Sequence, residues 1–149
     1  MEKRELVEIR EMEARDAGAV ARLTGELGYE RTPDSIQQWI ETAASHRHGQ
    51  AAYVACLGGE VVGWIEVSLE HRLQSEDFAL IGGLVVTREH RGRRIGERLC
   101  EQAEAWSREH GAARLRLTSR STRADAHRFY QREGFDLVKT SLVFEKKLR

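Results

Sequence analysis

The chain of 149 residues is long enough to bury the core of one domain, and its 40% hydrophobic and 32% charged residues are typical of globular proteins. The 24 Lys and Arg balance the 24 Asp and Glu, so a formal net charge of zero gives no general attraction to nucleic acid or to an anionic membrane. We therefore expect a single domain over residues 1–149 with neither a nucleic-acid nor a membrane partner.

The N-terminal segment and the spacing of the cysteines bear on the cellular compartment in which we expect the protein. Residues 1–12 lack the apolar run of a signal peptide, and nowhere do 18 apolar residues follow one another. Cys56 and Cys100 lie far apart without a CxxC motif, and His46 and His48 lack a third ligand at metal-binding spacing. These features predict a cytoplasmic protein with free thiols and no metal site.

The first half of the chain predicts a strand, two helices and a hairpin. Residues 6–12 partly alternate as a short strand, and Asp16 is placed to cap a first helix. Thr32 is a suitable N-cap for a second helix, because the proline that follows it is tolerated at the first helical position. Residues 51–71 then predict two strands joined at the glycines of positions 58–59, which tolerate the positive φ of a tight turn.

The second half begins with a nearly continuous apolar stretch over residues 78–86, which predicts a central strand. Gly82 and Gly83 interrupt this strand and favour a β-bulge. A long amphipathic helix is predicted from Ile95 to Gly111. The remaining predicted elements are a strand over residues 113–119, a short helix over residues 121–133 and two short closing strands over residues 135–148.

The resulting order, β-α-α-β-β-β-α-β-α-β-β, predicts the α/β class with a mixed central sheet and helices on both faces. The long helix lies between two strands in sequence, and such a unit normally forms a right-handed parallel crossover.

The segment VVTREHRGRRIGERL, residues 85–99, joins the central strand to this helix and contains five arginines. The start of a helix presents unpaired N–H groups and the positive end of the helix dipole, which suits a phosphate group. The segment lacks both the G-x-G-x-x-G pattern of dinucleotide-binding folds and the Lys-Ser or Lys-Thr of a P-loop. From the residues alone, a phosphate site and a solvated loop are equally open.

The segments GGLVVTREHRGRRIGERL and AHRFYQREGF, together with the order of elements, resemble the GCN5-related N-acetyltransferase (GNAT) superfamily over essentially the whole chain. In that family the signature Q/R-x-x-G-x-G/A binds the pyrophosphate of acetyl-CoA through backbone amides. The resemblance implies this role for Arg91, Gly92, Arg93, Arg94, Ile95 and Gly96, with Arg94 at a position where the family usually has glycine.

The resemblance also implies a splayed pair of parallel strands that holds the pantetheine arm of the acyl-CoA. In the family this arm bonds to the backbone of the fourth strand as an extra strand would. Leu84, Val85 and Val86 occupy the corresponding stretch here. Their side chains equally suit a plain core strand, so the contact would be made by the main chain.

The catalytic groups follow partly from the resemblance and partly from chemistry. Tyr130 matches the tyrosine of F-Y-x-x-x-G-F, which implies a general acid beside the departing sulfur. An amine of pKa about 10.4 is protonated at pH 7 and needs a base, but Leu80 replaces the carboxylate that many relatives carry on the fourth strand. Glu66 is the first choice, because Trp64 beside it would desolvate the carboxylate and raise its pKa. The other candidates are Glu70, His71, Glu76 and Asp77.

The resemblance implies an acetyl-CoA-dependent N-acetyltransferase in which an amine attacks the thioester directly, since Cys100 has no obvious base for an acetyl-enzyme route. A small-molecule acceptor is favoured over a protein, and its identity stays open. The alternative is a non-catalytic acyl-CoA-binding sensor or interaction module, which Leu80 keeps open. Nucleic-acid binding through residues 88–98 is a weaker hypothesis, because net basic charge and aromatic interleaving are absent. Relatives often dimerise, so a homodimer is a further expectation.

Overall fold

The computed structural model describes residues 6–45, 49–119 and 123–149. The chain divides into two compact units, Met1–Thr118 and Ser119–Arg149, and each is described by itself.

The first unit is built on a five-stranded sheet in which the strands follow one another in chain order. Adjacent strands from β1 to β4 pair antiparallel, whereas β4 and β5 pair parallel. The strands are β1 (Val7–Glu11), β2 (Gln50–Leu57), β3 (Glu60–Glu70), β4 (Phe78–Val86) and β5 (Leu115–Leu117). Gly58 and Gly59 form the turn between β2 and β3 with φ values of 58° and 82°. The predicted mixed α/β class is therefore confirmed.

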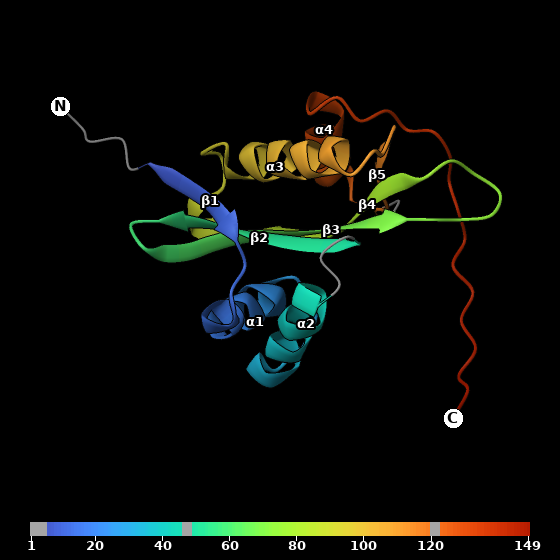
Figure 1. Cartoon of the computed structure of the whole chain (residues 1–149). Coiled ribbons are helices and arrows are strands. Elements are labelled where there is room, and N and C mark those ends of the chain that lie inside the picture. The colour runs from blue at the N-terminus through green and yellow to red at the C-terminus, as the bar shows by residue number, and fades with distance from the viewer. Residues whose placement is uncertain (1–5, 46–48, 120–122) are drawn as a thin grey trace. The chain divides into compact units, whose positions relative to one another are not determined.

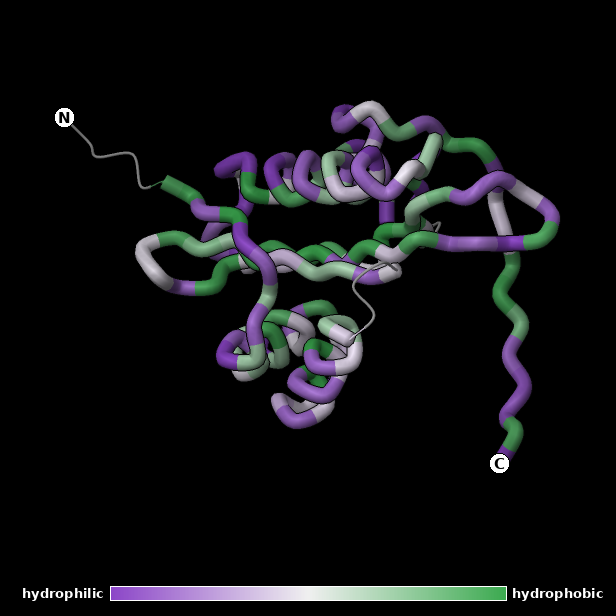
Figure 2. The backbone as a smooth tube through the Cα atoms, viewed as in Figure 1, coloured by the Kyte–Doolittle hydropathy of each residue, from purple (hydrophilic) through white to green (hydrophobic). Residues whose placement is uncertain are grey.

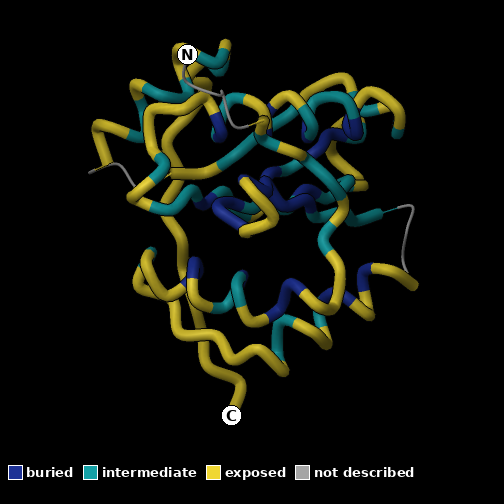
Figure 3. Tube along the Cα trace, turned by 90° about the vertical axis from the view of Figure 1, so that its left-hand side faces the viewer, coloured by how far each residue is buried: buried dark blue, intermediate teal, exposed yellow. Residues whose placement is uncertain are grey.

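Three helices cover this sheet on its two faces (Figure 1). On one face lie α1 (Ala17–Glu26) and α2 (Pro33–Ser45), and on the other lies α3 (Ile95–Glu109). Val20 and Leu23 of α1 pack with Val54 and Val85 of the sheet. Figure 3 shows buried positions along the strands and at intervals on the helices, as expected for amphipathic helices on a sheet. No helix among the described residues is both long and apolar enough to cross a bilayer.

Two predicted helix caps have different outcomes. Thr32 caps α2 as predicted, since its Oγ1 accepts a hydrogen bond from the Ser35 N–H at 3.1 Å. Asp16 makes no such cap for α1. Its buried carboxylate instead accepts two hydrogen bonds of 2.8 Å from Arg10 and one of 2.7 Å from the Glu13 N–H. A charged partner on β1 binds this carboxylate more strongly than a neutral amide would.

The second unit contains α4 (Ala124–Arg132), which is followed by a chain end without helix or strand. The two closing strands predicted over residues 135–148 are therefore wrong for this structure. A strand forms only where a neighbour pairs with its backbone. Residues 135–149 have no such neighbour in the described structure.

Candidate active site

A β-bulge distorts the centre of β4, as the two glycines predicted. Glu66 of β3 pairs with Gly83, but the next residue, Val67, pairs with Ile81, so Gly82 is the extra residue of β4. A Cβ atom on Gly82 would overlap the Glu66 carboxylate, and one on Gly83 would lie 2.6 Å from Cη2 of Trp64. The bulge therefore leaves room for the carboxylate of Glu66 and the indole of Trp64 directly over the β4 backbone.

The Glu66 carboxylate lies in an environment that disfavours its charge. Burial raises the pKa of Glu66 above its ordinary value. Among the described residues, no hydrogen bond or ion pair reaches this carboxylate to offset the loss of water. Glu66 is thus suited to take up a proton, as its position beside Trp64 predicted.

The other acidic candidates already have partners. Glu70 accepts hydrogen bonds from Ser68 at 3.2 Å and from Arg72 at 3.3 Å. Asp77 lies 2.6 Å from Nδ1 of His71, and this hydrogen bond raises the pKa of the histidine. Glu76 is exposed on the loop between β3 and β4. Among these candidates, Glu66 best combines burial with an unengaged carboxylate.

Beyond the bulge, one edge of β4 is open. Its pairing with β5 covers only residues 79–81, so residues 82–86 have no strand partner on that side in the described part of the chain. Val85 is buried in the core shared with α1, whereas Leu84 and Val86 are half-buried. The Nε of Arg91 donates a hydrogen bond to the Val86 carbonyl at 3.4 Å. Apart from the Val86 carbonyl, the backbone groups of Leu84–Val86 on this side have no strand partner in the described part of the chain, and their contact with the pantetheine arm stays a prediction.

The loop from β4 to α3 makes two left-handed turns. Gly92 has φ 85° and Arg94 has φ 62°, and nothing lies within 4 Å of the position that a Cβ on Gly92 would take. The first helical hydrogen bond of α3 runs from the Arg98 N–H to the Arg94 carbonyl at 3.1 Å. The N–H groups at positions 95–97 consequently have no acceptor inside the helix.

The side chains of this loop point to solvent. Arg91, Arg93 and Arg94 are exposed, Gly96 is half-buried, and Ile95 is buried in the core. The guanidinium of Arg94 lies 3.9 Å from the Glu97 carboxylate and is 85% exposed. Free amides and several cations therefore surround one point at the N-terminus of α3, which is the chemistry that binds a pyrophosphate.

Tyr130 lies on α4 in the second unit, whereas Glu66 and the arginine loop belong to the first. Its ring meets those of Phe129 and Phe135 edge-on, at centroid distances of 5.4 and 5.9 Å. The Phe135 N–H donates to the Tyr130 carbonyl at 3.0 Å across the turn at Gly134. The role of Tyr130 as general acid stays a prediction.

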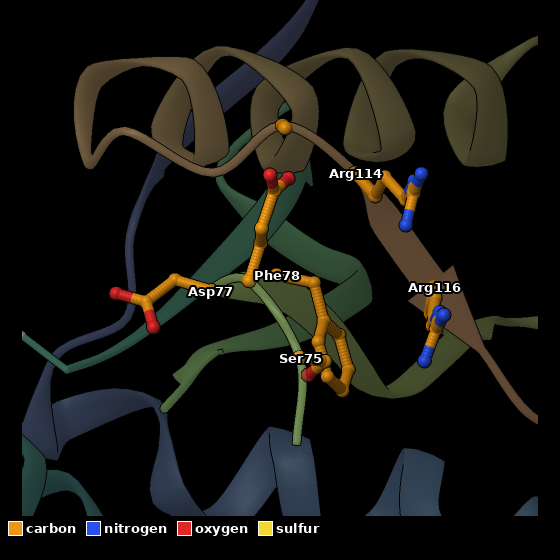
Figure 4. Close-up of a pocket in the computed structure, with 7 residues that line it drawn as sticks. Ser75, Asp77, Phe78, Arg114 and Arg116 are labelled. Carbon is orange, nitrogen blue, oxygen red and sulfur yellow. The ribbon is translucent and has the colours of Figure 1, made fainter. Parts of the chain in front are cut away.

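Sequence reasoning missed a cationic group around Phe78. The Cζ atoms of Arg72 and Arg116 lie 5.0 and 4.5 Å from the centre of its ring. Figure 4 shows Arg114 and Arg116 coming from the β5 segment beside Phe78, where they line a small pocket with Ser75. The alternation of ARLRLTS, with leucines at 115 and 117, already placed both arginines on one face of the strand.

This cationic group shares a sheet face with Glu66. Leu80 pairs with Ser68 on one side and with Arg116 on the other, so these three side chains form a row across the sheet. Glu66 lies two residues from Ser68 on β3 and therefore points to the same face. An amine at Glu66 and an anionic group at Arg116 would lie on one surface.

No group of three or more His, Cys, Asp or Glu residues suited to a metal ion occurs in the described ranges. His46 and His48 lie outside the described residues.

Comparison with known proteins shows the family. Residues 6–135 match the model of the acetyltransferase (GNAT) family. An aminoalkylphosphonate N-acetyltransferase of Salmonella typhimurium (strain LT2) is 40% identical over 83 residues, which are 55% of this chain and 54% of that protein. This match thus spans about half of the Salmonella protein. An aminoglycoside N(6')-acetyltransferase type 1 of Stenotrophomonas maltophilia is 28% identical over 145 residues, covering 94% of this chain and 93% of the relative.

The fold is also found among solved structures. The aminoglycoside N-acetyltransferase AAC(6')-Iy in complex with CoA superposes with a TM-score of 0.88 and covers 99% of both chains at 16% identity. At this sequence identity, the structural similarity supports only the assignment of the fold. The family match, which includes the bulged strand, the arginine loop and α4, decides the assignment. The chain belongs to the acetyltransferase (GNAT) family and is an acyltransferase whose cosubstrate is acetyl-CoA.

Proposed function

We propose that the protein transfers the acetyl group of acetyl-CoA to the amine of a small molecule, with Glu66 as the general base. The observation that carries this proposal is the Glu66 carboxylate itself. It is partly shielded from water, unpaired among the described residues, and placed over the bulge of β4 where pairing with β5 ends. The acyl group of a ligand that lies along the open β4 edge would reach this point.

The cosubstrate occupies two neighbouring features in this proposal. The pantetheine arm bonds to the backbone of Leu84, Val85 and Val86, whose outer edge lacks a strand partner among the described residues. The pyrophosphate binds at the start of α3, where free amides and the positive end of the helix dipole meet. The residues proposed for this contact are Arg91, Gly92, Arg93, Arg94, Ile95 and Gly96.

The transfer proceeds by direct attack. Glu66 takes a proton from the substrate ammonium, and the neutral amine attacks the thioester carbonyl carbon. The new C–N bond forms as the C–S bond breaks, and the nitrogen gives its second proton to solvent, to which Glu66 also releases the proton it took up. Tyr130 supplies the proton that the departing thiolate takes up and is itself reprotonated from solvent. The products are the N-acetyl compound, free CoA and one released proton.

We further propose that the acceptor carries a phosphonate or a similar anionic group. The relative from Salmonella is named for aminoalkylphosphonates. In this chain Arg116 lies on the same sheet face as Glu66, and no ion pair engages it within the described residues. Arg72, by contrast, is already paired with Glu70 at 3.3 Å. Stacking on Phe78 holds the Arg116 guanidinium in place to receive an anion.

A matched pair of amines tests this acceptor class. With aminomethylphosphonate and methylamine as substrates, release of the CoA thiol measures transfer, and we expect the phosphonate to react with the higher kcat/KM. Arg116→Ala should raise KM for the phosphonate about tenfold, through loss of one charge-assisted contact, and leave methylamine unchanged. Arg114→Ala is the control, because this neighbouring arginine makes no stacking contact with Phe78.

Two outcomes would contradict the proposal at different levels. Equal rates for both amines, or an Arg116→Ala variant with unchanged KM, would rule out the anionic acceptor but leave transfer itself intact. Tight acetyl-CoA binding without thiol release, across phosphonates, aminoglycosides and simple amines, would instead favour the non-catalytic binding module.

A further inference from the structure

The indole of Trp64 covers the backbone of β4 at the bulge. A Cβ atom on Gly83 would lie 2.6 Å from Cη2 and 2.8 Å from Cζ3 of this ring, so the six-membered part of the indole lies against the Gly83 backbone. The carboxylate of Glu66 occupies the corresponding space over Gly82. Side chains of β3 therefore fill the space over both glycines of β4.

The rest of the indole lies in apolar surroundings. Trp64 packs against the core cluster that includes Val20, Leu23, Val54 and Val85. Figure 2 shows hydrophobic stretches along the strands of this part of the sheet. The Nε1 atom of Trp64 is buried and has no hydrogen-bond partner in the described part of the chain. Because a buried N–H without a partner is unfavourable, the indole contributes volume and apolar contacts here and not a hydrogen bond.

The acyl end of the cosubstrate reaches the same part of β4. In the proposed function the pantetheine arm lies along residues 84–86, and the thioester follows at Gly82 and Gly83. Pairing with β5 closes the edge of β4 at residues 79–81, so the space beyond the thioester is limited along the strand. On the sheet face that carries Glu66, the large apolar group beside this point is the indole of Trp64.

We propose that Trp64 restricts the donor to acetyl-CoA by filling the space that a longer acyl chain needs. This role rests on the proposed function, because that function places the thioester at the bulge. The indole lies between the Gly83 backbone and the packed core, so it can move aside only by disturbing its neighbours. One methylene too many in a filled apolar pocket lowers kcat/KM about ten- to a hundredfold.

Calorimetric titration with CoA, acetyl-CoA and propionyl-CoA tests this role without any acceptor. We expect the wild type to bind propionyl-CoA about tenfold more weakly than acetyl-CoA, whereas Trp64→Leu should bind the two about equally. The affinity for CoA itself should not change, because CoA has no acyl group to meet the indole. Trp64→Phe removes less of the side chain and should give an intermediate ratio, which keeps the test valid should Trp64→Leu not fold.

The same donors are then compared in transfer. With aminomethylphosphonate as the acceptor, release of the CoA thiol gives kcat/KM for acetyl-CoA and for propionyl-CoA. Trp64→Leu should raise the ratio of propionyl to acetyl transfer about tenfold over that of the wild type.

Two further variants are the controls. Trp106→Leu makes the same chemical change at a buried position of α3, which covers the opposite face of the sheet from α1 (Figure 1). It should keep the wild-type donor ratio. Leu80→Ala removes an apolar side chain where β4 still pairs with β5, on the sheet face of Glu66. It should relax the donor ratio less than Trp64→Leu does.

Three results would overturn the role of Trp64. The first is a wild type that binds and uses propionyl-CoA as well as acetyl-CoA. The second is a Trp64→Leu variant that keeps the wild-type donor ratio. The third is a Trp106→Leu or Leu80→Ala variant that relaxes the ratio as much as Trp64→Leu. Absence of transfer to any amine, together with the expected binding ratios, would instead contradict the proposed function and support the role of Trp64.

Discussion

Arg94 adopts a left-handed backbone conformation with φ 62° and ψ 17° directly before α3. For a residue other than glycine this conformation costs about 1–2 kcal/mol. The neighbouring Ile95 is almost fully buried and fixes the start of the helix, so the packing of α3 imposes the turn. The loop therefore keeps the backbone shape that a glycine would take, while the side chain adds a cation beside the free amides.

Two substitutions separate the conformation of Arg94 from its charge. The free energy of unfolding of Arg94→Gly should be about 1 kcal/mol higher than that of Arg94→Ala, because only glycine takes positive φ without strain. Both variants should bind acetyl-CoA several-fold more weakly than the wild type, since both lack the guanidinium. Urea unfolding and calorimetric titration measure these quantities. Equal free energies of unfolding for the two variants would refute backbone strain at Arg94. An affinity for acetyl-CoA equal to that of the wild type would refute the contact between Arg94 and the phosphates.

At this scale, sequence reasoning succeeded where the chemistry was local. The neighbouring Trp64 predicted that burial would raise the pKa of Glu66, and burial does raise it, while the role of Glu66 as the base stays a prediction. Asp16 was predicted as a cap, but Arg10 takes its carboxylate because the chain turns back between β1 and α1. Burial alone would raise the pKa of Asp16, yet hydrogen bonds from Arg10 and the Glu13 N–H hold it below its ordinary value. Such a partner depends on the path of the chain and has no sequence signature.

Among the secondary structure elements, the bulged β4 strand connects the fold to the reaction. Gly82 leaves space for a carboxylate at the end of a flexible side chain, whereas Gly63 leaves space beside a backbone carbonyl. Replacing either glycine with alanine adds the same methyl group. The Glu66 side chain beside Gly82 can move to make room, whereas the Val85 backbone carbonyl beside Gly63 cannot. We therefore expect Gly82 to matter for the position of the Glu66 carboxylate and Gly63 for packing.

Alanine at these two positions should separate activity from stability. Gly82→Ala should displace the Glu66 carboxylate and lower kcat at least tenfold, with the free energy of unfolding changed by less than about 1 kcal/mol. Gly63→Ala should lower the free energy of unfolding by about 2 kcal/mol, because its Cβ would lie 2.9 Å from the Val85 carbonyl oxygen and 3.2 Å from Leu99. Thermal unfolding and thiol release measure both effects. A Gly82→Ala enzyme with full activity would show that the carboxylate position is unimportant.

The elements themselves were largely predictable, whereas their pairings were not. Helical spacing, glycine turns and the bulge follow from local sequence, and the structure confirms them in α2, α3 and β4. The grouping of Arg72 and Arg116 around Phe78 depends on the parallel register of β4 and β5, which are separated by a helix. The closing strands failed for a related reason, since a strand requires pairing with a distant segment, and residues 135–149 pair with no strand in the described structure.

For the molecule as a whole, a net charge of zero coexists with a strongly basic loop. The cations gather at the start of α3 and around Phe78, both within the first unit, while the rest of the chain is balanced by carboxylates. This distribution suits small anionic groups that bind at defined points more than a polyanion that needs an extended basic surface. It is consistent with an acetyl-CoA pyrophosphate at one point and an acceptor anion at the other.

The burial of Glu66 also has a cost for stability that depends on pH. Its folded-state pKa is raised, so the carboxyl group favours folding below the unfolded-state pKa, and this contribution is lost as the pH rises through the folded-state pKa. Glu66→Gln should therefore raise the free energy of unfolding at pH 8 relative to the wild type. Glu60→Gln, at an exposed position on the same strand, should leave it unchanged.

The pH dependence of kcat/KM for the acceptor amine tests the central claim most directly. The logarithm of the wild-type kcat/KM should rise with a slope of about one below the pKa of Glu66, because the carboxylate must be ionised to take the proton of the ammonium, and should be flat above it until the amine itself titrates. The break should lie above the ordinary glutamate pKa of about 4.3. Glu66→Gln should lower kcat/KM about a hundredfold or more and show a slope of one throughout. A Glu66→Gln variant that keeps the wild-type break and rate would contradict the assignment of Glu66 as the base.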